Sequence, residues 1–211
     1  MAKTQPFNEH LEQYEDWFVE NRAVYESELQ AMRTLLPQSR RAVEIGVGSG
    51  LFATPLGIQF GVEPSAKMRR LAKERGVRVI AGVAEYLPLR SSAFDLASMV
   101  TTVCFVDDVL ASFREVHRIL EPNGAFLLGF VDRTSRLGQL YETHKAENVF
   151  YRLATFYSTN ELLDLLEQAD FGQFETAQTV FGLLHEIKQP EPVKQGYGQG
   201  AFVVIRARKQ G

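Results

Sequence analysis

The sequence predicts an α/β protein with a doubly wound, mostly parallel sheet of seven strands that ends in a C-terminal antiparallel hairpin. Two observations favour this class. Apolar runs of strand length alternate with amphipathic stretches of helix length from residue 41 to residue 131, which is the order of parallel βαβ units. A glycine-rich turn follows the first run, and such turns lie at the carboxyl edge of open α/β sheets, where nucleotide-like ligands bind.

The N-terminal segment carries large apolar side chains at roughly helical spacing, which predicts one or two helices over residues 9–35. These side chains are Leu11, Tyr14, Phe18, Tyr25, Leu29, Met32 and Leu36. Pro37 ends the segment, because proline cannot continue a helix. We therefore expect residues 1–37 to form a helical lid ahead of a domain that spans residues 38–211.

The core of the chain contains five candidate strands followed by two more. The five are residues 41–46, 58–63, 77–81, 94–100 and 124–131. The first crossover, from Gly46 to Gly57, has about a dozen residues and is near the minimum for a parallel connection. A helix over about 107–120 follows, with Asp107 as its expected cap and an apolar stripe on one face.

Residues 132–157 are the least regular part of the chain. Directly after them, Ser158 and Glu161 have the spacing of a capping box before a leucine-rich helix. Residues 171–184 and 201–207 predict two final strands that are antiparallel to one another, joined by a loop rich in proline and glycine.

Composition excludes several classes of protein. A chain of 211 residues suits one domain, and its formal net charge of −3 argues against a surface that follows nucleic-acid phosphates. It has no apolar run long enough for a membrane span and no apolar signal core at its N-terminus, so we expect a cytoplasmic protein. The single cysteine, Cys104, excludes an internal disulfide and a cysteine-rich metal site, and no metal is expected. The sequence leaves open whether the protein is a monomer or a homodimer.

The glycine-rich turn contains Gly46, Gly48 and Gly50, with Glu44 two residues before it. A dinucleotide fingerprint needs glycine at the sixth position, where this chain has Leu51, so a nicotinamide-dependent oxidoreductase is disfavoured. Glu63 ends the second apolar run, and an acidic group at that place can accept both hydroxyls of an adenosine ribose.

Three further motifs follow in order: A-E-x-L-P-L at residues 84–89, S-x-F-D at residues 92–95 and R-x-L-x-P-x-G at residues 118–124. Together with the glycine turn and Glu63, they resemble a class I S-adenosylmethionine-dependent methyltransferase of the ubiquinone and menaquinone C-methyltransferase branch (methyltransferase type 11). The resemblance covers about residues 40–131. It implies a Rossmann-like fold, S-adenosyl-L-methionine as cofactor, and in-line transfer of a methyl group to a small-molecule acceptor.

The resemblance also implies which residues hold the cofactor. The resemblance places Glu44, Gly46, Gly48 and Gly50 around the methionyl part of the cofactor and Glu63 at the ribose. It places Pro64, Ala84 and Glu85 on the adenine side, and Thr101 and Thr102 at the sulfonium end. One position departs from the pattern. Relatives often have an aspartate where this chain has Val83, so we expect Glu85 or a backbone carbonyl to receive the adenine amino group.

The acceptor side is less defined by sequence, because methyl transfer needs positioning more than a fixed catalytic group. In this reading residues 132–157 form an insertion on the acceptor side. His144 and His185 are candidates for a proton acceptor, and Arg133 for contact with an anionic acceptor. Tyr14, Trp17 and Tyr151 are candidates for the roof of the pocket, although aromatic residues in helices equally serve packing.

Two functions other than methyl transfer remain as alternatives. One is the oxidoreductase, which Leu51 and the antiparallel end of the sheet both oppose. The other is a protein that binds S-adenosylmethionine without catalysis, as a sensor or an assembly partner. Such a protein would bind the cofactor but lack an acceptor pocket of useful size.

Overall fold

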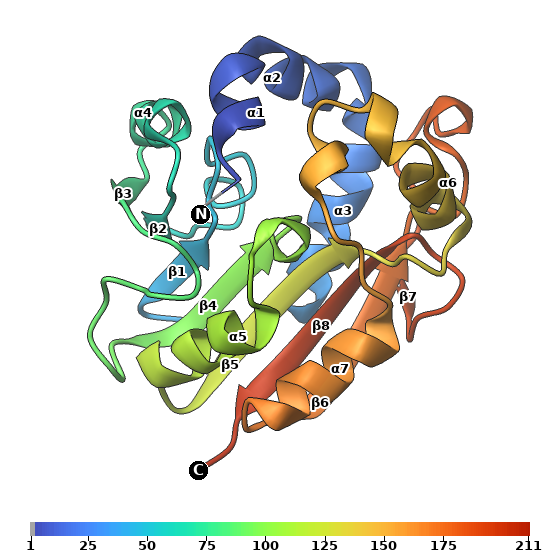
Figure 1. The fold of residues 1–211 in the computed structure, drawn as a ribbon. Helices are drawn as coiled ribbons and strands as arrows, with labels where there is room; N and C mark the ends of the chain where they lie inside the picture. The colour runs from blue at the N-terminus through green and yellow to red at the C-terminus, as the bar shows by residue number, and fades with distance from the viewer. Residues whose placement is uncertain (1–2) are drawn as a thin grey trace.

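A computed structural model describes residues 3–211 and shows one eight-stranded sheet with helices on both faces (Figure 1). The strand order is β3-β2-β1-β4-β5-β8-β6-β7. The strands are β1 (Ala42–Ile45), β2 (Phe60–Val62), β3 (Arg78–Ile80), β4 (Phe94–Val100), β5 (Leu120–Val131), β6 (Phe171–Thr179), β7 (Lys194–Gln195) and β8 (Phe202–Lys209). The first five pair in parallel, whereas β8 is antiparallel to both β5 and β6. The predicted fold class is confirmed, and the structure adds the two-residue strand β7 from the proline- and glycine-rich loop.

The prediction of one or two helices over residues 9–35 is confirmed, since two helices lie there, and the structure adds a short helix before them. The helices are α1 (Gln5–Glu9), α2 (Leu11–Glu20), α3 (Arg22–Leu35), α4 (Ala66–Glu74), α5 (Val109–Ile119), α6 (Arg136–His144) and α7 (Thr159–Gln168). His10 and Asn21 interrupt the N-terminal series because their backbones have ψ angles of 40° and 38°, outside the helical range. Four short 3-10 turns complete the fold: η1 (Val103–Phe105), η2 (Lys145–Glu147), η3 (Tyr151–Leu153) and η4 (Leu184–Glu186).

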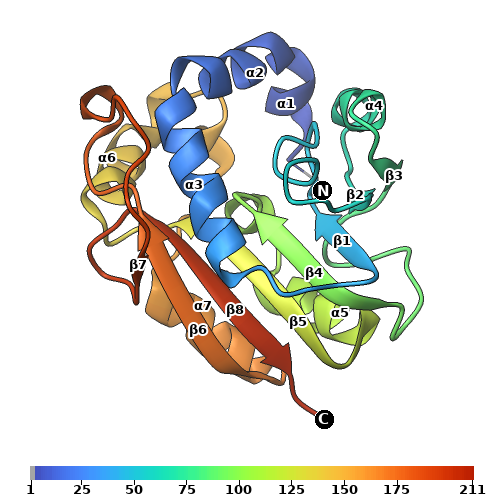
Figure 2. The same cartoon turned by 180° about the vertical axis from the view of Figure 1, so that it is seen from behind.

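The two faces of the sheet are covered by different helices. On one face α5 and α7 contribute fully buried residues such as Phe113 and Leu162, and on the other face α3 contributes Met32. Figure 2 shows α3 lying across the C-terminal half of the sheet, where it contacts β6, β8 and β5. This contact is close, because a Cβ on Gly129 of β5 would come within 2.7 Å of the Met32 sulfur. Helix α3 is therefore part of the core.

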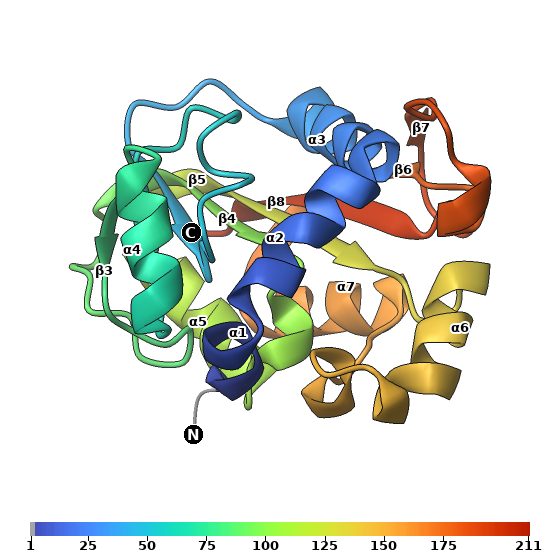
Figure 3. The same ribbon diagram turned by 90° about the horizontal axis from the view of Figure 1, so that it is seen from above.

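Helices α1 and α2 have a different position from α3. Seen from above, they cross the carboxyl ends of the parallel strands, between α4 and the segment that contains α6 (Figure 3). Helix α2 has no buried residue, which distinguishes it from α3 with its seven. Of the segment expected to act as a lid, α1 and α2 lie over the strand ends whereas α3 belongs to the core, and the lid role stays a prediction.

Local signals in the sequence were accurate to within a residue or two. The predicted capping box at the start of α7 is confirmed, with Ser158 and Glu161 each bonded to the other's backbone. The cap of α5 is Asp108 instead of Asp107, because the Asp108 carboxylate accepts from the Ala111 N–H at 2.9 Å. The first crossover consists of successive turns from Gly48 to Gly57. Among residues 3–211 no helix is long and apolar enough to cross a membrane.

Asp132 joins the end of β5 to the start of α7. Its carboxylate is buried, with one oxygen accepting from the Thr134 N–H and hydroxyl, both at 2.7 Å. The other oxygen accepts from the Thr159 N–H at 3.1 Å and from the Thr159 hydroxyl at 2.5 Å. Four hydrogen bonds to one buried carboxylate therefore hold this corner of the fold, from which the irregular segment 133–157 leaves.

We expect Asp132→Ala to lower the free energy of unfolding by about 2–4 kcal/mol, since it leaves buried N–H and hydroxyl groups without partners. Urea unfolding measures the change. Asp164→Ala, at an exposed position of α7, is the control and should change the stability by less than about 0.5 kcal/mol. Equal losses in the two variants would contradict the role assigned to Asp132.

Candidate active site

A cavity of about 740 Å³ opens at the carboxyl ends of the parallel strands, beneath α1 and α2. This volume is within the range of small-molecule sites, and the position is the one at which open α/β sheets bind ligands. Its walls come from segments that follow strands β1 to β4, from the end of β5 and from the N-terminal helices. The residues after the first four strands include Gly46, Gly48, Glu63, Val83, Ala84, Glu85, Thr101 and Thr102, and β5 contributes Phe130 and Val131.

The turn after β1 has a left-handed backbone at each of its three glycines, with φ of +69° at Gly46, +53° at Gly48 and +86° at Gly50. Gly46 meets a second requirement, because a Cβ there would lie 2.2 Å from the Thr102 methyl carbon. Thr102 also donates its hydroxyl to the Gly46 carbonyl at 3.1 Å, so it fastens the turn to the end of β4. Gly46 and Gly48 line the cavity, whereas Gly50 packs against Ala72 of α4.

Glu63 lies where the resemblance placed it, at the end of β2 and against the turn. Its carboxylate accepts the Gly48 N–H at 3.0 Å and the Ser65 N–H at 2.7 Å. Burial raises the pKa of this carboxyl, and the two N–H donors together with the charge of Arg69 oppose the rise. A carboxylate has about four lone-pair sites, so both oxygens can still accept hydroxyl protons from a ligand in the cavity. Pro64 lines the cavity beside it.

Glu44 is buried behind the glycine turn, with 2% of its surface exposed. Its Oε2 forms no hydrogen bond with the residues that the structure describes. Burial, and then the nearby Glu63 charge, raise the pKa of Glu44 to about 8. Arg41, the neighbour that could have paired with it, instead binds Glu121. A buried carboxylate with no neighbouring cation is unfavourable, and a positively charged ligand nearby would stabilise it.

The adenine-side residues predicted from the sequence all line the cavity, but Glu85 has a structural partner there. Its Oε1 accepts the backbone N–H groups of Asp107 and Asp108, at 2.7 and 3.3 Å. Val83 forms a bridge with Tyr86, and Ala84 is buried between them. Glu85 therefore anchors the loop that enters α5, and one of its oxygens is engaged before any ligand binds.

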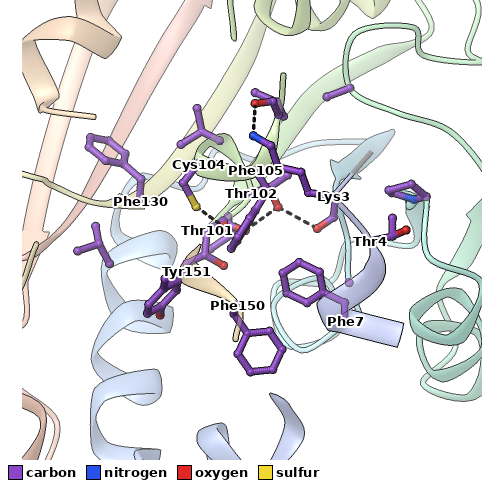
Figure 4. Close-up of a pocket in the computed structure, with 18 of the residues that line it drawn as sticks. Lys3, Thr4, Phe7, Thr101, Thr102, Cys104, Phe105, Phe130, Phe150 and Tyr151 are labelled. Carbon is purple, nitrogen blue, oxygen red and sulfur yellow. Dashed lines mark hydrogen bonds between the residues drawn. The ribbon is translucent and has the colours of Figure 1, made fainter. Parts of the chain in front are cut away.

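The turn after β4 carries strain at the centre of the cavity. Thr101 has φ of +49°, an unusual conformation for a β-branched residue, and its N–H donates to the Gly129 carbonyl at 2.8 Å. Figure 4 shows Thr101 and Thr102 in the middle of the cavity, with Phe130 and Tyr151 on one side and Phe7 on the other. Thr101 thus lies between two parts of one cavity.

The part of the cavity next to Tyr151 is lined by aromatic rings, and we call it the aromatic part. Tyr141 of α6 and Tyr151 of η3 have ring centroids 4.7 Å apart, and Phe156 is 5.5 Å from Tyr151. The sequence-predicted roof residues Tyr14, Trp17 and Tyr151 line the cavity, with Tyr14 beside Gly48 at the glycine turn. Burial raises the pKa of Tyr14 far above its usual value, so its hydroxyl stays protonated.

Four lining residues of this aromatic part were not predicted as site residues from the sequence: Glu28, Phe130, Tyr141 and Phe156. For Glu28 a signal existed. It stands four residues before Met32, on the same face of the predicted helix as the apolar stripe, and a carboxylate there is unusual. The three aromatic residues carry no local sign that separates them from ordinary core residues.

The three candidates for direct catalysis or acceptor contact do not line the cavity. His144 contacts the Leu140 carbonyl through Nδ1 at 3.0 Å, on the exposed side of α6. The His185 side chain is 76% exposed next to Glu186. Arg133 donates to Glu161 Oε1 at 2.7 Å and to the Phe156 carbonyl at 3.3 Å. The geometry therefore gives none of them a position from which to contact a bound acceptor.

The fold and the site together define a class I S-adenosylmethionine-dependent methyltransferase. The defining features are an open sheet with this strand order, a glycine turn after β1, an acidic residue at the end of β2 and an antiparallel C-terminal pair of strands. Comparison with known proteins agrees. A family model described as "Methyltransferase domain" matches residues 43–128. The chain belongs to the S-adenosylmethionine-dependent methyltransferases, because a solved member of that family is 51% identical over 98% of this chain.

Three relatives illustrate the range of similarity. A solved S-adenosylmethionine-dependent methyltransferase of Thermotoga maritima, described as a possible histamine N-methyltransferase, is 51% identical with a TM-score of 0.96, over 98% of this chain and 100% of its own. An uncharacterized protein of Methanocaldococcus jannaschii is 37% identical over 203 residues, which is 96% of this chain and 98% of that protein. A demethylmenaquinone methyltransferase of Roseiflexus castenholzii is 35% identical over 98 residues, which is 42% of this chain and 41% of that protein.

The residues at the glycine turn fit S-adenosylmethionine. The cofactor carries a sulfonium and an ammonium, and Glu44 behind the turn is a buried carboxylate without a cation among the described residues. Its ribose hydroxyls need an acceptor, and Glu63 presents a carboxyl group at the cavity wall. The absence of a side chain at Gly46 and Gly48 lets a ligand approach the backbone. The protein is an enzyme that uses this cofactor, and the individual contacts are predictions.

We expect Gly46→Ala to weaken binding of S-adenosylhomocysteine by roughly 10–100-fold, since overpacking costs of about 1–3 kcal/mol are typical and the new Cβ meets Thr102. Isothermal titration measures the affinity. The matched control is Gly57→Ala, which also has a left-handed backbone (φ +73°) but whose Cβ would meet nothing within 4 Å. The prediction is wrong if both variants lose affinity to the same extent.

The raised pKa of Glu44 makes the stability of the ligand-free protein depend on pH. Below its usual value of 4.5 the carboxyl is protonated in both states; as the pH rises towards about 8 only the unfolded state releases the proton. Stability therefore falls over this window. Glu44→Gln removes this contribution, so the variant should become more stable relative to wild type as the pH rises. Urea unfolding at several pH values measures the difference, and Glu74→Gln on the exposed face of α4 should show none.

Proposed function

We propose that the protein transfers the methyl group of S-adenosylmethionine to a small molecule that binds in the aromatic part of the cavity. The observation that carries this proposal is the continuity of one cavity. It joins the glycine turn and Glu63 at one end to Phe130, Tyr141 and Tyr151 at the other. A transferase that moves a group between two small molecules needs both in one water-poor space, with reacting atoms roughly 3–3.5 Å apart.

The cofactor supplies the activated methyl group, so the chain has to hold and orient the two reactants and to exclude water from them. In this proposal Glu63 accepts the ribose hydroxyls, while Gly46 and Gly48 leave room for the methionyl part. Glu44 stabilises the positive charge from behind the turn. Thr101, at the junction of the two parts of the cavity, faces the sulfonium end, and its strained backbone is held by the hydrogen bond to Gly129.

In this proposal helices α1 and α2 cover the cavity and close it. Phe7 of α1 packs edge-on against Phe105 of η1, with centroids 5.0 Å apart, and also contacts Phe150 at 5.4 Å. Glu15 of α2 forms an ion pair with Arg75 after α4. These contacts join α1 and α2 to the rim of the cavity, where a segment that opens to admit ligands and closes to exclude water would act.

For the acceptor we propose a small molecule with a partly apolar body, since aromatic rings line most of its part of the cavity. The Thermotoga maritima relative is described as a possible histamine N-methyltransferase, and the Roseiflexus castenholzii relative is a demethylmenaquinone methyltransferase. Both descriptions concern small molecules with a ring. Segment 133–157 provides Tyr141, Phe150 and Tyr151, and so acts as the acceptor-side insertion in this proposal.

Titration of the purified protein with S-adenosylmethionine and S-adenosylhomocysteine tests the cofactor half of the proposal. We expect Glu63→Gln to weaken binding roughly 10–100-fold, because hydrogen bonds to a charged acceptor contribute about 1.5–3 kcal/mol. Glu74→Gln, on the exposed face of α4, is the matched control and should bind like wild type.

A screen for demethylation of the cofactor in the presence of small amines, phenols and quinols tests the transfer half. Formation of S-adenosylhomocysteine that depends on the acceptor supports the proposal. Tight cofactor binding with no turnover in the whole screen would favour a binding protein without catalysis. Absence of cofactor binding by the wild type would contradict both.

A further inference from the structure

Glu28 is a buried carboxyl group that faces the aromatic part of the cavity. It lies on the inner face of α3, one turn before Met32, which packs against Gly129 of the sheet. Its side chain lines the cavity, although only 5% of the residue is exposed. It forms no hydrogen bond or ion pair with a residue that the structure describes, in contrast to Glu26 on the outer face, which pairs with Arg22 at 2.7 Å.

The surroundings of Glu28 contain no compensating positive charge. Burial alone raises the pKa of its carboxyl to about 8, with no opposing effect from a cation. The titratable groups that interact electrostatically with it are the phenols of Tyr25 on its own helix, Tyr141 of α6 and Tyr151 of η3. Burial raises the pKa of each of these phenols, so all three are neutral. Among the described lining residues Lys3 is the only cation, and its Nζ faces the Val106 carbonyl and Asp107.

Aromatic faces occupy the rest of this part of the cavity. Tyr141, Tyr151 and Phe156 form one cluster, with centroid separations of 4.7 to 6.1 Å, and Phe130 and Trp17 line the same cavity. The π-faces of such rings attract cations, most strongly where water is excluded. A lone buried carboxyl within an aromatic enclosure combines two features that both favour a positively charged ligand and both disfavour an anion.

We propose that Glu28 binds the ammonium group of the methyl acceptor, so that the acceptor is a small cationic amine with an apolar or aromatic body. This inference rests on the proposed transferase function and specifies its substrate class. The amine brings the charge that Glu28 lacks, and the rings of Tyr141 and Tyr151 cover its body. An anionic acceptor would instead meet a carboxyl that can only repel it when ionised.

The test is isothermal titration of the protein saturated with S-adenosylhomocysteine, near neutral pH. The probes are phenethylamine and its uncharged counterpart 2-phenylethanol, with benzylamine and benzyl alcohol as a smaller pair. We expect wild type to bind the amine of at least one pair about tenfold or more tighter than the alcohol. Glu28→Gln should abolish that preference and leave S-adenosylhomocysteine binding unchanged, whereas the control Glu26→Gln should keep both.

A second readout separates binding by Glu28 from general affinity for amines. Because the empty site holds Glu28 largely protonated near neutral pH, binding of an ammonium should release a proton from it to the buffer. The observed heat should then change with the ionisation enthalpy of the buffer for wild type and Glu26→Gln, and should not do so for Glu28→Gln.

The outcomes distinguish this inference from the function on which it rests. If wild type binds S-adenosylhomocysteine but binds neither amine better than its alcohol, the assignment of Glu28 is overturned and the transferase proposal stands. A preference for amines that survives Glu28→Gln overturns it equally. If wild type does not bind S-adenosylhomocysteine, the proposed function itself fails. The wild-type comparison of amine with alcohol needs no variant, so it decides the question even if Glu28→Gln does not fold.

Discussion

The site depends on one set of close contacts, those that hold the turn after β1 against its neighbours. The N–H groups of Gly46 and Val47 both donate to the Val62 carbonyl at the end of β2, and the Gly48 N–H donates to Glu63. On the other side Thr102 packs directly on Gly46 and donates to its carbonyl. The turn can approach the end of β4 because Gly46 has no side chain, and Val47 of the turn can approach β2 because Gly61 has none. Three strand ends therefore form one wall, on which the cavity is built.

Burial of carboxyl groups is the second constraint, and it opposes stability. Glu44 lies behind the glycine turn and Glu28 lines the aromatic part; burial raises the pKa of each to about 8, and neither has a cation among the described residues. Glu28 lies on the core helix α3, one turn before Met32 that packs against Gly129, and Glu44 lies in the central strand β1. Ligands with positive charge at these two places would recover the lost stability. Glu28 lines the cavity and Glu44 lies directly behind its wall, and strongly perturbed carboxyls are typical of functional sites.

The parts that could be predicted from the sequence are those in which neighbouring residues act through the backbone. The glycine turn, the acidic end of β2 and the capping box of Ser158 and Glu161 are all of this kind. The errors have a common cause, which is that orientation depends on distant partners. His144 and Arg133 belong to segments next to the cavity, but the packing of α6 and the ion pair with Glu161 direct their side chains elsewhere. The N-terminal segment likewise divides into a core helix and two rim helices, because only α3 has a sheet to pack against.

The sequence by itself determined the class of enzyme and the cofactor, since the motifs that carry them lie on consecutive strand ends and their spacing sets their geometry. The tertiary structure decided what surrounds the methyl acceptor. Glu28 and Tyr151 are 123 positions apart, on a helix behind the sheet and a 3-10 turn beyond it. No local pattern connects two such residues. They face one cavity because α3 packs on β5, β6 and β8 while the segment after Asp132 turns back across the carboxyl ends of the strands.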